Sequence, residues 1–183
     1  TYEPMYFVVG GDTSDITARL QFGAQYRILR PREPGLPERE GVWGSIESVL
    51  DHVHVGYTQS SVWDLSSPSA PFRDTSFRPA LYYLNPDLIE PIGVLKQFGL
   101  QAGLEHESNG KSGLDSRSIN ILFVRPILTL GEPREYHWTL APKIYAYVEK
   151  QDNRDIPDYR GYFDLAIKFG KPDGIELTTT LRK

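Results

Sequence analysis

The chain has 183 residues, no cysteine and a formal net charge of −4 at pH 7. This length suffices for one domain, and the lack of cysteine excludes disulfides, thiolate zinc sites and a catalytic thiol. The net charge offers no bulk attraction to nucleic acid, so we expect no nucleic-acid partner. Aromatic residues make up 12% of the sequence, with 11 tyrosines and 16 glycines, which is typical of β structure rich in turns.

The predicted elements are strands. In residues 18–28, every second side chain is apolar, and the side chains between them are polar or glycine. The alternation recurs, in chain order, in residues 97–107, 137–148 and 161–169. Each run is about ten residues long, the length of a tilted strand that crosses a bilayer. Segments rich in turn residues separate the runs, so we expect about nine antiparallel strands, no helix and no internal domain boundary.

Two kinds of all-β protein fit this pattern. A soluble β-sandwich or a lipocalin-like barrel would show the same alternation as a transmembrane β-barrel, whose strands bury only alternate residues in lipid. The chain has no apolar stretch of about 18 residues and therefore no predicted membrane-spanning helix. The polar positions are mostly Gln, Arg, Glu, Lys and Gly, a composition that suits the wet lumen of a barrel. This composition favours the transmembrane barrel.

Residues 103–120 are the segment best suited to chemistry. His106 and Ser108 are two positions apart in a predicted strand, so their side chains project from the same face. A turn follows, with Gly113 at its centre. Antiparallel pairing about this glycine places His106 opposite Asn120, because the two are equidistant from it.

The same pairing places Ser118 opposite Ser108, and Ser116 opposite Gly110. These residues would share the face that carries the apolar side chains of the preceding strand, which are Phe98, Leu100, Ala102 and Leu104. A histidine, a serine and an amide on an apolar barrel face are costly unless they have a function. We therefore regard the face as a possible active site.

The chemistry open to this face is nucleophilic catalysis. Ser108 could act as a nucleophile if His106 takes its proton, and the side-chain carbonyl of Asn120 could fix the tautomer and orientation of the imidazole. An amide orients the ring without adding charge, which suits an apolar surface. The alternative is that the pair is incidental, as most His-x-Ser pairs are. His52 and His54 could similarly form a metal pair, although hydrogen-bonded lumen lining is the favoured interpretation.

The segment also resembles a known family. It reads His106-Glu107-Ser108-Asn109-Gly110-Lys111-Ser112, followed by Ser116-Arg117-Ser118-x-Asn120, and is similar to the signature of outer-membrane phospholipase A. Further similarity lies in Tyr57-Thr58-Gln59 through Trp63 and Leu65, in Pro71-Phe72-Arg73-Asp74-Thr75 and in Gly161-Tyr162. The likeness covers nearly the whole chain.

This resemblance implies a twelve-stranded antiparallel transmembrane barrel with its active site on the outer wall. The implied activity is hydrolysis of the acyl ester bonds of phospholipids and lysophospholipids, with A1, A2 and lysophospholipase specificity. Ser108 would be the nucleophile, His106 the base and Asn120 the orienting residue. The main-chain groups of Ser108 and Gly110 would stabilise the oxyanion.

The resemblance further implies a calcium ion bound between the subunits of an active homodimer. Ser116 would supply a side-chain oxygen, Lys111 a main-chain carbonyl, and Ser69 a main-chain carbonyl from the other subunit. Lys111 stands where the family has arginine, and a carbonyl ligand is compatible with that exchange. Gln59 would be a polar residue of the dimer interface within the membrane.

The family has about three more strands than the alternation predicts here. We therefore expect residues 1–183 to be a single β-barrel domain that lacks its C-terminal strands. The first residues, Thr1-Tyr2-Glu3-Pro4, are no signal peptide, so the mature form in the outer membrane of a Gram-negative bacterium is expected. Two other functions remain open, a barrel without catalysis and a soluble lipid-binding β-barrel.

Overall fold

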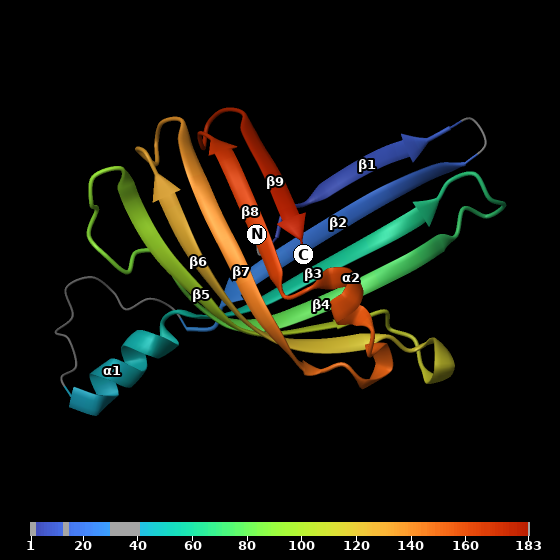
Figure 1. Cartoon of the computed structure of the whole chain (residues 1–183), viewed down its shortest axis with the longest axis horizontal. Coiled ribbons are helices and arrows are strands. Elements are labelled where there is room, and N and C mark those ends of the chain that lie inside the picture. The colour runs from blue at the N-terminus through green and yellow to red at the C-terminus, as the bar shows by residue number, and fades with distance from the viewer. Residues whose placement is uncertain (1–2, 13–14, 30–40, 183) are drawn as a thin grey trace.

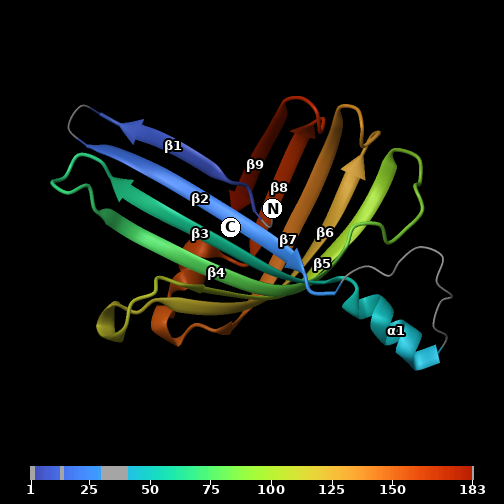
Figure 2. The ribbon, with the colours of Figure 1, turned by 180° about the vertical axis from the view of Figure 1, so that it is seen from behind.

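The computed structural model describes residues 3–12, 15–29 and 41–182. In these residues, nine strands form one sheet in which each strand pairs antiparallel with its neighbours in chain order. The strands are β1 (Tyr6–Gly11), β2 (Ile16–Arg27), β3 (Val53–Asp64), β4 (Phe72–Asn85), β5 (Leu95–Ser108), β6 (Ser118–Leu130), β7 (His137–Glu149), β8 (Phe163–Gly170) and β9 (Glu176–Arg182). The sheet curls into a half-barrel with β1 and β9 at its edges (Figure 1 and Figure 2). The predicted antiparallel all-β fold is confirmed.

The two faces of the curled sheet differ in chemistry. On β5, the side chain of Leu104 points outward and is 53% exposed, whereas the neighbouring Glu105 points inward and is 2% exposed. The outer face carries many other exposed apolar residues, among them Phe22, Tyr26, Val55, Leu81, Leu122, Val124, Trp138 and Ile144. On the inner face, the Lys143 ammonium lies 3.0 Å from the Glu105 carboxylate. Apolar residues outside and charged residues inside are the arrangement of a membrane barrel.

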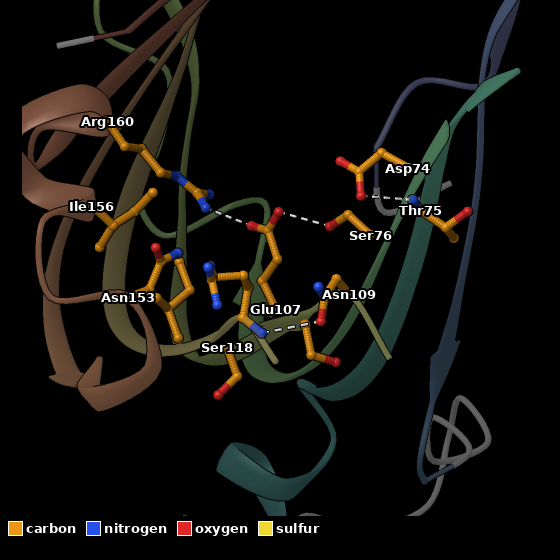
Figure 3. Close-up of a pocket in the computed structure, with 12 residues that line it drawn as sticks. Asp74, Thr75, Ser76, Glu107, Asn109, Ser118, Asn153, Ile156 and Arg160 are labelled. Atoms are coloured by element: carbon orange, nitrogen blue, oxygen red, sulfur yellow. Dashed lines mark hydrogen bonds and ion pairs between the residues drawn. The ribbon is translucent and has the colours of Figure 1, made fainter. Parts of the chain in front are cut away.

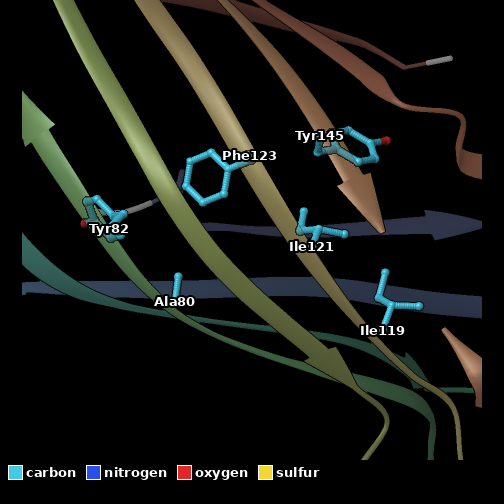
Figure 4. Close-up of a cluster of buried hydrophobic side chains, with 6 residues drawn as sticks. All are labelled: Ala80, Tyr82, Ile119, Ile121, Phe123 and Tyr145. Carbon is cyan, nitrogen blue, oxygen red and sulfur yellow. The ribbon is translucent and has the colours of Figure 1, made fainter. Parts of the chain in front are cut away.

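An apolar cluster also lies on the inner face (Figure 4). It contains Ala80, Tyr82, Ile119, Ile121, Phe123 and Tyr145. Gly103 of β5 lies between Tyr82 of β4 and Phe123 of β6 in the strand ladder. A Cβ atom on Gly103 would lie 2.6 Å from the Cα of Tyr82, so glycine allows the two aromatic residues to close over β5.

The two neighbouring histidines occupy different environments. His54 is buried on the inner face, where its ring stacks on Tyr82 at a centroid distance of 5.6 Å. Its Nδ1 lies 2.9 Å from the main-chain oxygen of His52, which itself precedes β3. Among the described residues, no three His, Cys, Asp or Glu side chains gather as a metal site. The geometry is that of hydrogen-bonded lining.

The prediction of no helix was wrong. Helix α1 (Gly41–Leu50) lies between β2 and β3, and the short helix α2 (Ile156–Arg160) lies between β7 and β8. Apolar residues recur in α1 at helical spacing, but two glycines weaken the helical propensity of the segment. In α2, a proline occupies the first turn, where it is tolerated. No helix in the described part of the chain is long and apolar enough to cross a membrane.

Candidate active site

The hairpin of β5 and β6 brings the predicted catalytic residues together. In its register, His106 pairs with Asn120 and Ser108 pairs with Ser118, as the symmetry about Gly113 predicts. Gly113 begins a single 3-10 turn and has a φ of 66°, a left-handed conformation that glycine adopts without strain. The turn therefore determines the register of the hairpin, and the register determines which side chains of the two strands lie opposite each other.

The His106 ring is bonded to the Asn120 side chain. Nδ1 of His106 lies 2.8 Å from Oδ1 of Asn120. An amide oxygen only accepts hydrogen bonds, so Nδ1 must donate and Nε2 is left with its lone pair. Asn120 Nδ2 in turn donates to the Glu149 carboxylate at 3.5 Å, which agrees with this orientation of the amide. The histidine is therefore held in the tautomer that can accept a proton at Nε2.

The site lies on the outer face of the barrel wall. His106 is two positions from Leu104 in β5, so the two side chains share a face. Asn120 is likewise two positions from Leu122 in β6. Both leucines are about half exposed. The alternate residues, such as Ile121, are buried on the inner face. The predicted side chains therefore point outward from the barrel, among the exposed apolar residues of that face.

Ser108 is the last residue of β5, two positions after His106 and on the same face. In the ladder it pairs with Phe77 of β4 and with Ser118 of β6. Within the described residues, its hydroxyl makes no hydrogen bond to His106, whose ring is bonded to Asn120. The geometry thus contains the His106–Asn120 link of the predicted set, and the serine lies beside it on the same face.

The prediction that Ser116 continues this ladder opposite Gly110 was wrong. The paired positions of β5 and β6 end at Ser108 and Ser118, because the chain turns away into the loop of residues 109–117. Gly110 has a φ of 68°, and a Cβ on it would lie 2.8 Å from Cε2 of Phe77. Both the left-handed φ and the nearby ring favour glycine here, and its main chain lies close to Phe77 of β4.

The loop of residues 109–117 carries two of the predicted calcium ligands. Lys111 is exposed near its start, and Ser116 lies just before β6. A cationic group already draws carbonyls of this loop together, since the Arg117 guanidinium donates to the main-chain oxygens of Leu114 at 3.0 Å and Ser116 at 2.6 Å. Oxygen donors of this kind are what calcium prefers. Lys111 and Ser116 would add a main-chain carbonyl and a hydroxyl, so the loop offers donor types that calcium accepts.

The other two predicted residues lie on β3 and in the turn that follows it. Ser69 is exposed in the turn between β3 and β4, at the same end of the barrel as the loop of residues 109–117, with a φ of 65°. Gln59 lies on β3 between Phe22 and Phe77 of the adjacent strands. Its Oε1 accepts a hydrogen bond from the Tyr57 hydroxyl at 3.0 Å. Gln59 and Ser69 thus lie apart from the His106–Asn120 pair, and their assignment to a subunit interface stays a prediction.

The inner side of β5 holds a charged group that the sequence analysis missed. Glu107, between His106 and Ser108, points inward, where it accepts a hydrogen bond from Ser76 at 2.7 Å and forms an ion pair with Arg160 of α2 (Figure 3). These residues line a cavity of about 170 Å³. Burial by itself would lower the pKa of Arg160. The negative charges of the nearby carboxylates, chiefly that of Glu107, have the larger effect and hold this pKa above its ordinary value. Arg160 is 53 residues from Glu107, so no local motif reveals the pair.

Comparison with known proteins gives the family of the chain. The family model described as phospholipase A1 matches residues 39–183. The chain belongs to the phospholipase A1 family. It is 32% identical to phospholipase A1 of Escherichia coli (strain K12) over 138 residues and 33% identical to that of Proteus vulgaris over 131 residues. These alignments cover 73% and 70% of this chain but only 45% and 43% of the relatives, so the chain spans less than half their length.

Solved structures show the same fold. Outer membrane phospholipase A from Escherichia coli is similar with a TM-score of 0.67 and 26% identity, over 90% of this chain and 61% of that one. The outer membrane phospholipase dimer of Salmonella typhi with bound calcium is similar with a TM-score of 0.66 and 25% identity, over 90% of this chain and 58% of that one. The family resemblance and the antiparallel barrel fold predicted from the sequence are both confirmed.

Proposed function

We propose that this phospholipase A1 family member hydrolyses acyl ester bonds of phospholipids and lysophospholipids in the outer membrane of a Gram-negative bacterium. The observation that carries the proposal is the 2.8 Å bond between His106 and Asn120 on the apolar outer wall. A base held in its proton-accepting tautomer, beside a serine and facing lipid, suits attack on an ester that never leaves the membrane. Both ester positions of the glycerol are reachable from an open wall, which supports A1, A2 and lysophospholipase activity.

The first half of the reaction forms an acyl-enzyme. His106 Nε2 takes the proton of the Ser108 hydroxyl while its oxygen attacks the ester carbonyl carbon. Main-chain N–H groups of Ser108 and Gly110 stabilise the resulting oxyanion, and glycine is favoured at the second position. The intermediate then collapses, the ester C–O bond breaks, and His106 gives its proton to the departing alcohol oxygen. Asn120 keeps the ring oriented throughout.

The second half of the reaction releases the fatty acid. His106 Nε2 takes a proton from water, whose oxygen attacks the acyl carbon and forms a second oxyanion in the same place. The bond from that carbon to Ser108 breaks, and the proton returns to the serine oxygen. The product is a free fatty acid, and the serine and histidine regain their starting protonation states.

We further propose that the active form is a calcium-bound homodimer. Lys111 and Ser116 of one subunit and Ser69 of the other would hold the ion through oxygen atoms. When bound, calcium supplies positive charge near the oxyanion. Gln59, which lies on the outer wall of β3, would pair with its counterpart across the interface. The calcium-bound dimer known for the Salmonella typhi relative supports this assembly.

The test is phospholipid hydrolysis by the full chain in detergent micelles, with calcium and then with a chelator. We expect fatty-acid release that requires calcium and disappears in the Ser108→Ala variant. Release of acid at the same rate from that variant would overturn the serine mechanism. Binding of phospholipid without release would instead identify a barrel or lipid-binding protein without catalysis.

A further inference from the structure

The loop that carries the proposed calcium ligands has almost no side-chain packing. Residues 111–115 are all exposed, and Leu114 is 98% exposed. Two glycines in left-handed conformations, Gly110 and Gly113, add backbone freedom to the unfolded loop that must be lost when it orders. Hydrogen bonds must therefore supply most of the order that a metal site needs in this loop.

The side-chain amide of Asn109 makes three of those bonds. Its Oδ1 accepts from the main-chain N–H of Lys111 at 3.2 Å and from that of Arg117 at 3.1 Å, and its Nδ2 donates to the main-chain oxygen of Asp115 at 2.8 Å. The Asn109 N–H also donates to the Arg117 main-chain oxygen at 3.1 Å. One planar group thus ties the start of the loop to its end.

The residues that Asn109 binds are chain neighbours of the residues proposed to act on the oxyanion and the ion. Gly110 lies between Asn109 and Lys111, and Ser116 lies between Asp115 and Arg117. With both neighbours of Ser116 bonded to one amide, its main chain has little freedom to move relative to Lys111. The amide is well suited to this task, since its oxygen accepts two N–H groups while its nitrogen donates to a carbonyl. A carboxylate would lose the donor, and alanine would lose all three bonds.

We propose that Asn109 is a positioning residue, whose amide sets the Lys111 carbonyl and the Ser116 hydroxyl for calcium and the Gly110 N–H for the oxyanion. The inference rests on the proposed function and assigns this asparagine a task of its own within it. Asn109 touches neither the substrate nor the ion. It acts through the loop, so its loss should appear first in calcium affinity and only secondarily in turnover at saturating calcium.

The experiment measures calcium binding directly, by isothermal titration calorimetry of the full chain in detergent micelles, beside hydrolysis over a calcium series. In Asn109→Ala we expect calcium affinity to fall by about tenfold or more, the loss that one or two hydrogen bonds produce. Added calcium should restore most of the turnover. In Asn109→Ser, a hydroxyl can still accept a main-chain N–H, so an intermediate affinity is expected.

The matched control is Asn85→Ala. Asn85 Oδ1 accepts from the main-chain N–H of Asp87 at 3.0 Å in the turn after β4, at the other end of the barrel. This change removes a similar bond and should leave calcium affinity unchanged. Unaltered calcium affinity in Asn109→Ala would overturn the inference. Absence of hydrolysis by the unchanged protein would overturn the proposed function instead, and the calorimetric comparison would still decide the role of Asn109 in binding the ion.

Discussion

The ring of His106 and the amide of Asn120 meet at 2.8 Å although they are 14 residues apart in the chain. They meet because they occupy opposite positions in the β5–β6 ladder, and that register follows from the turn centred on Gly113. The ladder also places the pair on the outer face of the sheet, among exposed apolar residues such as Leu104 and Leu122.

Ser108→Ala should abolish phospholipid hydrolysis, because it removes the hydroxyl that lies two positions after His106 on the same strand face, which is the proposed nucleophile. Folding should change little, since a hydroxyl at the end of a strand contributes little packing. Ser118→Ala is the matched control, because Ser118 lies directly opposite in the ladder and should be dispensable. The measurement is fatty-acid release in micelles. Activity that is retained by Ser108→Ala but lost in Ser118→Ala would show that Ser118, and not Ser108, is the nucleophile.

Asn120→Ala should lower kcat on the order of 10²-fold without abolishing activity. The variant keeps the nucleophile and the base but loses the acceptor that holds His106 in the proton-accepting tautomer. KM should change much less than kcat, because Asn120 does not contact the acyl chain in the proposed mechanism. Steady-state kinetics with a chromogenic ester separate the two constants. A change confined to KM would contradict the orienting role.

Ser116→Ala should weaken calcium binding and dimerisation together. Each subunit alone offers too few oxygens for an ion that prefers six to eight, so the second subunit completes the site. By linkage, dimerisation should raise the calcium affinity by the same factor by which calcium raises the dimerisation constant. Chemical crosslinking in micelles across a calcium titration measures both effects. A monomer–dimer equilibrium that does not change with calcium, together with full activity in the presence of a chelator, would contradict a role of the ion and of the dimer interface in the mechanism.

Gln59→Leu should weaken the dimer without altering the calcium ligands. Gln59 lies on the outer wall, where, among the residues that the structure describes, its amide oxygen accepts a hydrogen bond from the Tyr57 hydroxyl. A hydrogen bond between membrane-embedded subunits is worth about 0.6 kcal/mol, or roughly a threefold change in the dimerisation constant. Sedimentation in micelles at fixed calcium measures that constant. A dimer as strong as that of the unchanged protein would exclude Gln59 from the interface.

Lys143→Met should destabilise the barrel strongly. The Lys143 ammonium and the Glu105 carboxylate are both nearly inaccessible and 3.0 Å apart, so the change leaves a buried carboxylate without its nearest cation. We expect a loss of about 3 to 5 kcal/mol in unfolding free energy. Adding Glu105→Gln should recover most of it.

The control for that change is Lys168→Met, which removes an exposed ion pair with Glu176 on the neighbouring strand. Its effect on the unfolding free energy should stay below about 1 kcal/mol. Urea titration in micelles measures all three variants. Equal losses in Lys143→Met and Lys168→Met would mean that the interior pair is not shielded from water.

The sequence by itself determined several strands and the register that pairs His106 with Asn120. Alternation in residues 18–28, 97–107, 137–148 and 161–169 predicts β2, β5, β7 and β8, because side chains on a strand point to opposite faces in turn. The pairing of His106 with Asn120 follows from simple counting about Gly113, since a hairpin turn fixes register locally. Helix α1 was missed although its apolar spacing is readable, because glycines and a preceding turn-like segment masked it.

The tertiary structure alone decided what lies behind and around the site. The ion pair of Glu107 with Arg160 joins residues far apart in the chain, and the bond from Asn109 to Asp115 depends on how the loop folds back. Neither has a periodic signature, because such contacts arise from the curvature of the sheet and the path of connecting segments. The alternation of apolar and polar residues in the sequence determines which face of the sheet a side chain occupies. The path of the folded chain determines which distant residue that side chain contacts.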